Sequence, residues 1–146
     1  MNRRALVTVL VVLGAGGCGS GSLSGTQLRS QATRACQTAD GQTDRIPTPT
    51  SPDGGVAFLK RGIAALAPEL VRLRALRPPS DLAQVYSTAI SASSDELRAL
   101  RATVRGLKAD GDPVIAIKTL EQKLAPMESQ ANGAWQALEV PACVNR

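Results

Sequence analysis

The residues that could do chemistry in this chain are few, and its cysteines are the most informative of them. The sequence has 146 residues and contains Cys18, Cys36 and Cys143 but no histidine. The lack of histidine excludes Ser-His and Cys-His catalysis, His-ligated metal sites and the commonest proton shuttle. A metal site built on two of the cysteines would lack suitable third and fourth ligands. We therefore expect no bound metal, and we expect the cysteines to act through the covalent bonds that they form.

The acidic and hydroxyl side chains do not complete a catalytic arrangement either. Glu121 and Glu128 are seven residues apart on one face of a predicted helix and could share a cation, but solvated positions beside an apolar seam explain them more simply. Ser93 has no accompanying base. Inward-facing Glu-x-x-His pairs, a haem attachment motif and a phosphate-binding glycine loop are missing. We predict that the protein is not an enzyme and uses no cofactor.

The N-terminal segment has the pattern of an export signal. Arg3 and Arg4 precede the apolar run Ala5–Leu13, which is too short for a spanning helix of about 20 apolar residues. Small residues, Ala15-Gly16-Gly17, then stand directly before Cys18, and a Gly/Ser stretch follows it. This arrangement resembles the lipobox of bacterial lipoproteins, although Ala15 stands where that family usually has Leu.

The resemblance implies that Cys18 becomes the N-terminus and carries thioether-linked diacylglycerol, with palmitate as a typical acyl group. Residues 1–17 would be the signal peptide, residues 18–25 a flexible tether and residues 26–146 the folded domain. Cys18 would hold this domain on the extracytoplasmic face of the cell membrane, because two or more acyl chains anchor a protein durably. The alternatives are an ordinary secretory signal cleaved elsewhere and an uncleaved anchor.

The two remaining cysteines predict a disulfide. Cys36 and Cys143 form an even pair in a chain that we expect to be exported to an oxidising compartment. Their positions near opposite ends of the mature domain predict one long-range bridge, which contributes about 4–5 kcal/mol in the chain-entropy model. The alternative is two free thiols.

Apolar residues repeat at helical spacing in four segments, which predicts an all-α chain. The segments are 26–40, 56–76, 82–107 and 114–138. A long Pro/Gly-rich loop at 43–55 separates the first two, and short breaks at Arg77-Pro78-Pro79 and Asp110-Gly111-Asp112-Pro113 separate the others. Short connections make antiparallel neighbours. We therefore predict a four-helix up-and-down bundle closed by the Cys36–Cys143 disulfide.

The apolar seams of the last three segments predict the core. In the second segment the seam follows a heptad spacing, and in the fourth it begins at Val114 and runs to Leu138. Tyr86 and Trp135 fall on these seams. They could line a ligand pocket within the bundle, but lone aromatic residues at helical spacing are more often core residues.

The net charge of the chain does not indicate a nucleic-acid partner. The formal net charge of +5 includes Arg3 and Arg4, so the mature chain carries +3, which is too mild to indicate nucleic-acid binding. Two basic groups stand out: Arg72, Arg74 and Arg77, and then Arg98, Arg101 and Arg105. They could contact anionic lipid headgroups or cell-wall polymers, or they could be ordinary solvated helix faces. In an antiparallel hairpin these two groups need not merge.

The break at Leu76-Arg77-Pro78-Pro79 and the ending Leu138-Glu139-Val140-Pro141-Ala142-Cys143 resemble small helical lipoproteins predicted in high-GC actinobacteria. That group has no settled activity, so the resemblance implies a location and a fold only. We expect a non-enzymatic interaction or adaptor module of the cell envelope with a protein partner there. The alternative is a carrier or sensor that binds a small apolar ligand or lipid between the helices, and an internal cavity would distinguish the two.

Overall fold

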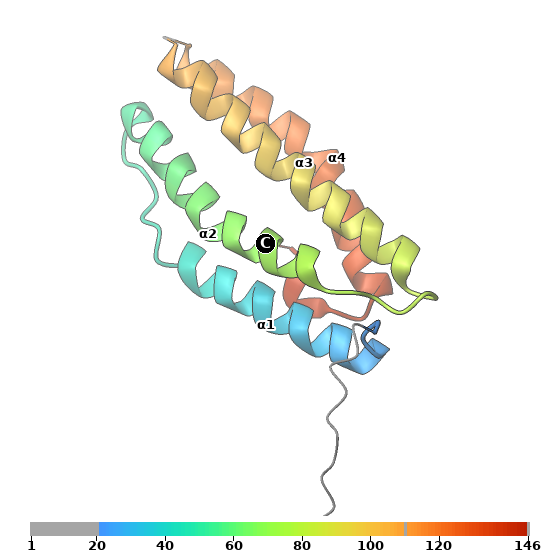
Figure 1. Ribbon diagram of the computed structural model, residues 1–146. Coiled ribbons are helices and arrows are strands. Elements are labelled where there is room, and N and C mark those ends of the chain that lie inside the picture. The colour runs from blue at the N-terminus through green and yellow to red at the C-terminus, as the bar shows by residue number, and fades with distance from the viewer. Residues whose placement is uncertain (1–20, 110, 146) are drawn as a thin grey trace, which may run out of the picture.

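A computed structural model describes residues 21–109 and 111–145 of the chain. Within these residues the fold is four α-helices without a strand, as the sequence predicts. The helices are α1 (Gly25–Thr43), α2 (Gly55–Ala75), α3 (Ala83–Lys108) and α4 (Pro113–Ala137), with 3-10 turns η1 (Pro52–Gly54) and η2 (Pro141–Cys143). Consecutive helices run in opposite directions and form the predicted up-and-down bundle (Figure 1).

Two side-chain caps fix where the first and last helices begin. Ser24 Oγ accepts a hydrogen bond from Gln27 N at 3.2 Å, and Gln27 Oε1 accepts one from Ser24 N at 2.9 Å, which completes a capping box. Asp112 Oδ1 accepts from the amides of Val114 and Ile115 at 2.8 and 3.0 Å. Both caps satisfy amide groups that a helix leaves unpaired at its start.

The predicted disulfide closes one end of the bundle, which we call the disulfide end. Cys36 in α1 is bonded to Cys143 in η2, with their Cα atoms 5.3 Å apart. The η2 turn packs against both α1 and α4. Around the bridge lies the larger core cluster, built mainly from Leu28, Ala32, Leu73, Tyr86, Trp135, Leu138 and Val140.

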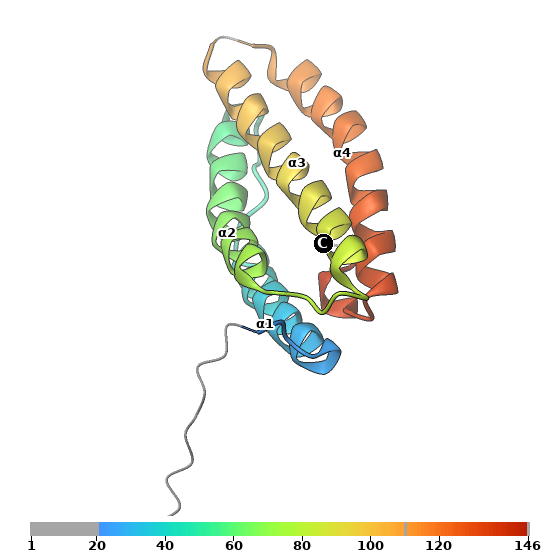
Figure 2. The ribbon, with the colours of Figure 1, turned by 45° about the vertical axis from the view of Figure 1, so that its right-hand side comes forward.

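The opposite end, which we call the open end, is built from three helices instead of four. Helix α1 has 19 residues, whereas α3 has 26 and α4 has 25, so the loop 44–54 runs beside the rest of α2 (Figure 2). The buried residues of the core cluster at this end are Leu59, Val104 and Leu120, and each of them remains slightly exposed. The seam of α2 is therefore well covered at its C-terminal end and thinly covered at its start.

The last residues of the predicted tether belong to the folded domain. The amide of Leu23 donates to the carbonyl oxygen of Arg77 at 2.8 Å, and the Leu23 side chain packs against the larger core cluster. Ser24 caps α1, which begins at Gly25. The sequence placed the domain boundary at residue 26 because a Gly/Ser-rich segment has no apolar periodicity to mark these contacts.

Candidate functional site

A groove lined mainly by apolar side chains lies at the open end. The loop, the start of α2 and the first turns of α4 enclose about 630 Å³ there. We call this the apolar groove, and its main lining residues are Pro49, Phe58, Pro113, Val114 and Ile117, with Lys118 and Glu121 also among those that line it. Pockets of this size hold small ligands or partner side chains in other proteins.

Large apolar side chains are exposed around this groove. Val114 is 67% exposed and the neighbouring Ile115 is 65% exposed, while Phe58 is 36% exposed. The sequence placed Val114 on the buried seam of α4, and that expectation is wrong. The seam begins at Val114 in the sequence, but α1 ends before this level of the bundle, so no fourth helix covers the first turn of α4.

The loop beside the apolar groove is held close to α2 by a glycine. A Cβ atom on Gly54 would lie 2.7 Å from Cβ of Pro49, a distance that two carbon atoms do not tolerate. Gly54 also directly precedes the first residue of α2. The absence of a side chain at this position thus lets Pro49 form one wall of the groove.

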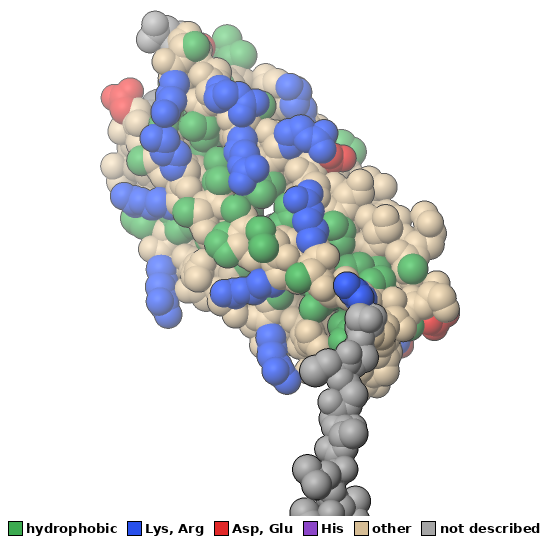
Figure 3. All heavy atoms as spheres, in the orientation of Figure 1, with side chains coloured by type: hydrophobic (Ala, Val, Ile, Leu, Met, Phe, Trp, Pro, Cys, Tyr) green, Lys and Arg blue, Asp and Glu red, His purple; other side chains and the backbone are tan. Residues whose placement is uncertain are grey.

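A second groove lies between α2 and α3 and is lined by arginine. Arg74 of α2 and Arg98, Arg101 and Arg105 of α3 line a space of about 380 Å³, which we call the basic groove. Its apolar lining is Ala67, Leu70, Val71 and Leu97. Figure 3 shows Lys and Arg side chains gathered on this face, with few Asp and Glu side chains. The two arginine groups of the sequence therefore do meet, through Arg74.

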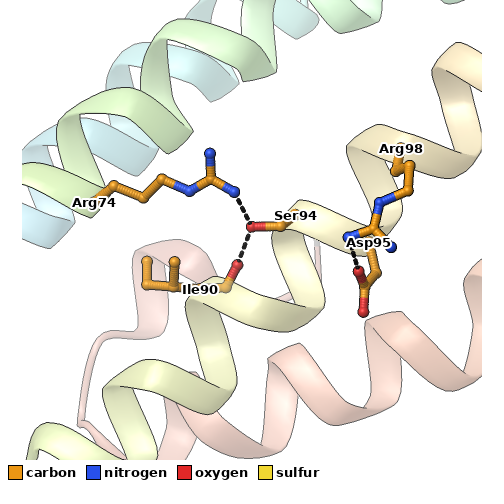
Figure 4. Close-up of polar contacts among 5 residues, drawn as sticks. All are labelled: Arg74, Ile90, Ser94, Asp95 and Arg98. Carbon is orange, nitrogen blue, oxygen red and sulfur yellow. Dashed lines mark hydrogen bonds and ion pairs between the residues drawn. The ribbon is translucent and has the colours of Figure 1, made fainter.

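A hydrogen bond holds Arg74 across this groove. Its Nη2 atom donates to Oγ of Ser94 on α3 at 2.7 Å, and the Ser94 hydroxyl donates to the carbonyl oxygen of Ile90 at 2.5 Å (Figure 4). Arg98 instead forms an ion pair with Asp95, with Nη2 and Oδ1 2.6 Å apart. Among the described residues, neither Arg101 nor Arg105 has an acidic partner.

The structure places Tyr86 and Trp135 in the packed core of the disulfide end. Their rings meet edge to face with centroids 5.8 Å apart, and Trp135 is 0% exposed. The Tyr86 hydroxyl donates to the carbonyl oxygen of Leu73 at 2.7 Å. Burial raises the pKa of the Tyr86 phenol above its ordinary value, because the phenolate would lose its hydration.

The space beside Glu69 is small and is lined by both leucine and polar side chains. Leu66, Leu70 and Leu73 line it together with Ser93, Glu69 and Glu96, and its volume is about 20 Å³, enough for about one water molecule. Glu69 is 4% exposed, with Oε1 3.3 Å from the Cys36 Sγ atom. Apolar periodicity alone does not reveal a carboxylate that is turned inward in this way.

The remaining candidate residues take no part in either groove, except that Glu121 borders the apolar one. Glu128 is exposed on α4. Within the described ranges, no three His, Cys, Asp or Glu side chains are grouped to hold a metal ion. The proposed signal peptide and Cys18 lie outside the described residues, and among the described helices none has the length and apolarity to cross a bilayer.

Comparisons of the chain with models of protein families, with curated proteins and with solved structures find no match.

Proposed function

We propose that this protein is an extracytoplasmic lipoprotein, anchored through Cys18, whose bundle is a non-enzymatic adaptor that binds a protein partner of the cell envelope. The single observation that carries the adaptor role is the apolar groove with its exposed Phe58 and Val114, next to the exposed Ile115. Contiguous exposed apolar side chains around a groove are typical of interaction sites. The Cys36–Cys143 disulfide supports an oxidising location.

The position of the groove suits a tethered adaptor. The chain reaches the bundle at Leu23, which is bonded to Arg77 near the disulfide end. The apolar groove lies at the opposite end, and α3, which spans the distance, has 26 residues and is about 39 Å long. An anchor at Cys18 would therefore leave the groove free to meet a partner, since the two features lie at opposite ends of the bundle.

Photo-crosslinking in intact cells tests the adaptor role. A photoreactive amino acid at Val114 of the full-length protein should give a discrete adduct with one envelope protein, and Phe58→Glu should abolish it because it places a charge in the groove. The same amino acid at Glu128, which is exposed on α4 and lines neither groove, is the matched control. Equal adducts at both positions, or an adduct that survives Phe58→Glu, would refute the adaptor proposal.

Metabolic labelling tests the anchor separately. A radioactive fatty acid should label the full-length protein, and Cys18→Ala should remove the label. Label that survives this substitution would refute the lipoprotein assignment while leaving the adaptor test unaffected.

The size of the apolar groove supports a second candidate, a carrier or sensor for a small apolar ligand or lipid. Its volume of about 630 Å³ is within the usual range for ligand sites. The site would differ from the pocket expected near Tyr86 and Trp135, since both residues are packed in the core. Native mass spectrometry of the exported protein decides this: a carried small molecule adds a mass that leaves on denaturation, whereas a bare protein mass favours the adaptor.

A further inference from the structure

The cations of α3 form one stripe parallel to the axis of the bundle. Arg98, Arg101 and Arg105 repeat every three or four residues, and Lys108 continues the spacing. Residues at this spacing share one face of a helix, so the stripe is about 15 Å long. Arg74 faces it from α2 across the basic groove. A bundle lying on its side would present all of these cations to a plane at once.

We propose that the basic groove docks onto an anionic phospholipid surface, so that the bundle lies flat against the membrane. The inference rests on the proposed function only for the identity of that membrane, which is the one that would hold Cys18. The charge of the groove and its apolar lining do not depend on that assignment.

The apolar lining favours a lipid surface over a soluble polyanion. Val71 lines the basic groove and is 66% exposed, so an apolar side chain lies within a cationic rim. A bilayer interface offers phosphate groups to the rim and acyl chains to the centre. A hydrated linear polyanion offers nothing apolar to Val71.

The place where the chain reaches the bundle also favours the membrane. Leu23 is bonded to Arg77, just beyond the C-terminal end of α2, and α2 forms one wall of the groove. Cys18 precedes Leu23 by five positions, and an extended chain covers at most about 18 Å over that length. An acylated Cys18 would thus keep α2 near the membrane and raise the local concentration of lipid phosphate around the groove.

Vesicle binding without an acyl chain is the test. The chain from residue 19 onward keeps every described helix, both core clusters and the disulfide. It should sediment with vesicles of phosphatidylcholine and phosphatidylglycerol, but not with phosphatidylcholine alone, and high salt should release it. Failure to bind the anionic vesicles at low salt would overturn the proposal.

Matched double variants locate the binding surface. Arg101→Gln with Arg105→Gln should weaken binding about 30-fold, because each basic residue near an anionic surface contributes about 5-fold. Lys60→Gln with Lys123→Gln removes the same charge from residues that line neither groove and should change binding less than about 3-fold. All four side chains are exposed, so both variants should fold. An equal loss of vesicle binding in the two variants would mean that net charge, and not the basic groove, determines binding. That result would overturn the proposal.

Two single variants sharpen the result. Asp95→Asn frees Arg98 from its ion pair and should strengthen binding to anionic vesicles about 5-fold. Val71→Ser should weaken vesicle binding about 5-fold but leave binding to soluble poly(glycerol phosphate) unchanged. Binding to this polymer without binding to vesicles would assign the groove to a linear polyanion and overturn the membrane proposal. Because this chain carries no lipid, its result is independent of fatty-acid labelling at Cys18.

Discussion

At the disulfide end, Trp135 and Leu73 are fully buried, whereas at the open end the best-covered side chains, Leu120 and Leu59, remain slightly exposed. Helices α2, α3 and α4 contribute to the core at both ends, but Tyr86 and Trp135 belong only to the disulfide end. The cause of the difference in burial is that α1 and η2 cover only one end. A region with less buried apolar surface is less stable locally and retains surface for binding. One end therefore stabilises the fold, and the other leaves exposed the surface that we propose for partner binding.

Removal of the disulfide should lower the free energy of unfolding more than any other substitution considered for the two ends. Cys36→Ala with Cys143→Ala frees a loop with a sequence separation of 107, and the chain-entropy model predicts a loss of about 4–5 kcal/mol. The free energy of unfolding, measured by urea titration of the oxidised protein and the variant, tests this. A loss below about 1 kcal/mol would mean that packing alone closes the disulfide end.

A matched pair of leucines on α2 compares the two ends directly. Leu73→Ala at the disulfide end should lower the free energy of unfolding by about 4 kcal/mol, because a rigid, fully covered site cannot collapse around the cavity. Leu59→Ala at the open end should cost about 2 kcal/mol, because its half-covered neighbours can relax. Urea titration of both variants measures the difference. Equal losses would contradict the contrast between the two ends.

The sequence predicts the features that each helix determines by itself. Apolar periodicity and the Pro/Gly breaks predict four helices at nearly their observed bounds, and cysteine parity predicts the disulfide. The relative lengths of neighbouring helices are not encoded in a single seam, so the exposure of Val114 was missed. The same limit applies to Arg74, which meets the α3 arginines only because of the way α2 packs against α3.

The sequence contains a signal for some residues of the candidate site but not for others. Ile115 lies off the predicted seam beside Val114, and this pair of adjacent apolar residues at the start of a helix was the available signal for the apolar groove. The inward orientation of Glu69 had no comparable signal, because the position looks like any flank of a seam. Its burial depends on the disulfide and on α3, which are distant in sequence.

Tyr86 allows a smaller and pH-dependent test of the disulfide end. Tyr86→Phe removes the hydrogen bond to the Leu73 carbonyl and should cost about 1–1.5 kcal/mol at neutral pH. Since burial raises the phenol pKa in the folded state, the stability from this group is present below about pH 10, the unfolded value, and is lost as the pH rises above it.

The free energies of unfolding of the wild type and of Tyr86→Phe should therefore converge at alkaline pH. Urea titrations of wild type and Tyr86→Phe on both sides of about pH 10 measure this difference, and lysine titration cancels because it is common to both. The chain has a single tyrosine, so phenolate absorbance reports Tyr86 alone. A constant difference across this range would show that the phenol ionises as easily in the folded protein as in the unfolded chain.

The smallest effect on stability should come from the residues proposed to contact a partner. Val114→Ser with Ile115→Ser replaces side chains that are already two-thirds exposed, so the free energy of unfolding should change by less than about 0.5 kcal/mol. The same variant should lose the envelope crosslink made from another groove position, Ile117. Val71→Ser, which is equally exposed on α2, should keep it. A stability loss above about 1 kcal/mol would mean that Val114 and Ile115 belong to the core and that the open end has no free binding surface.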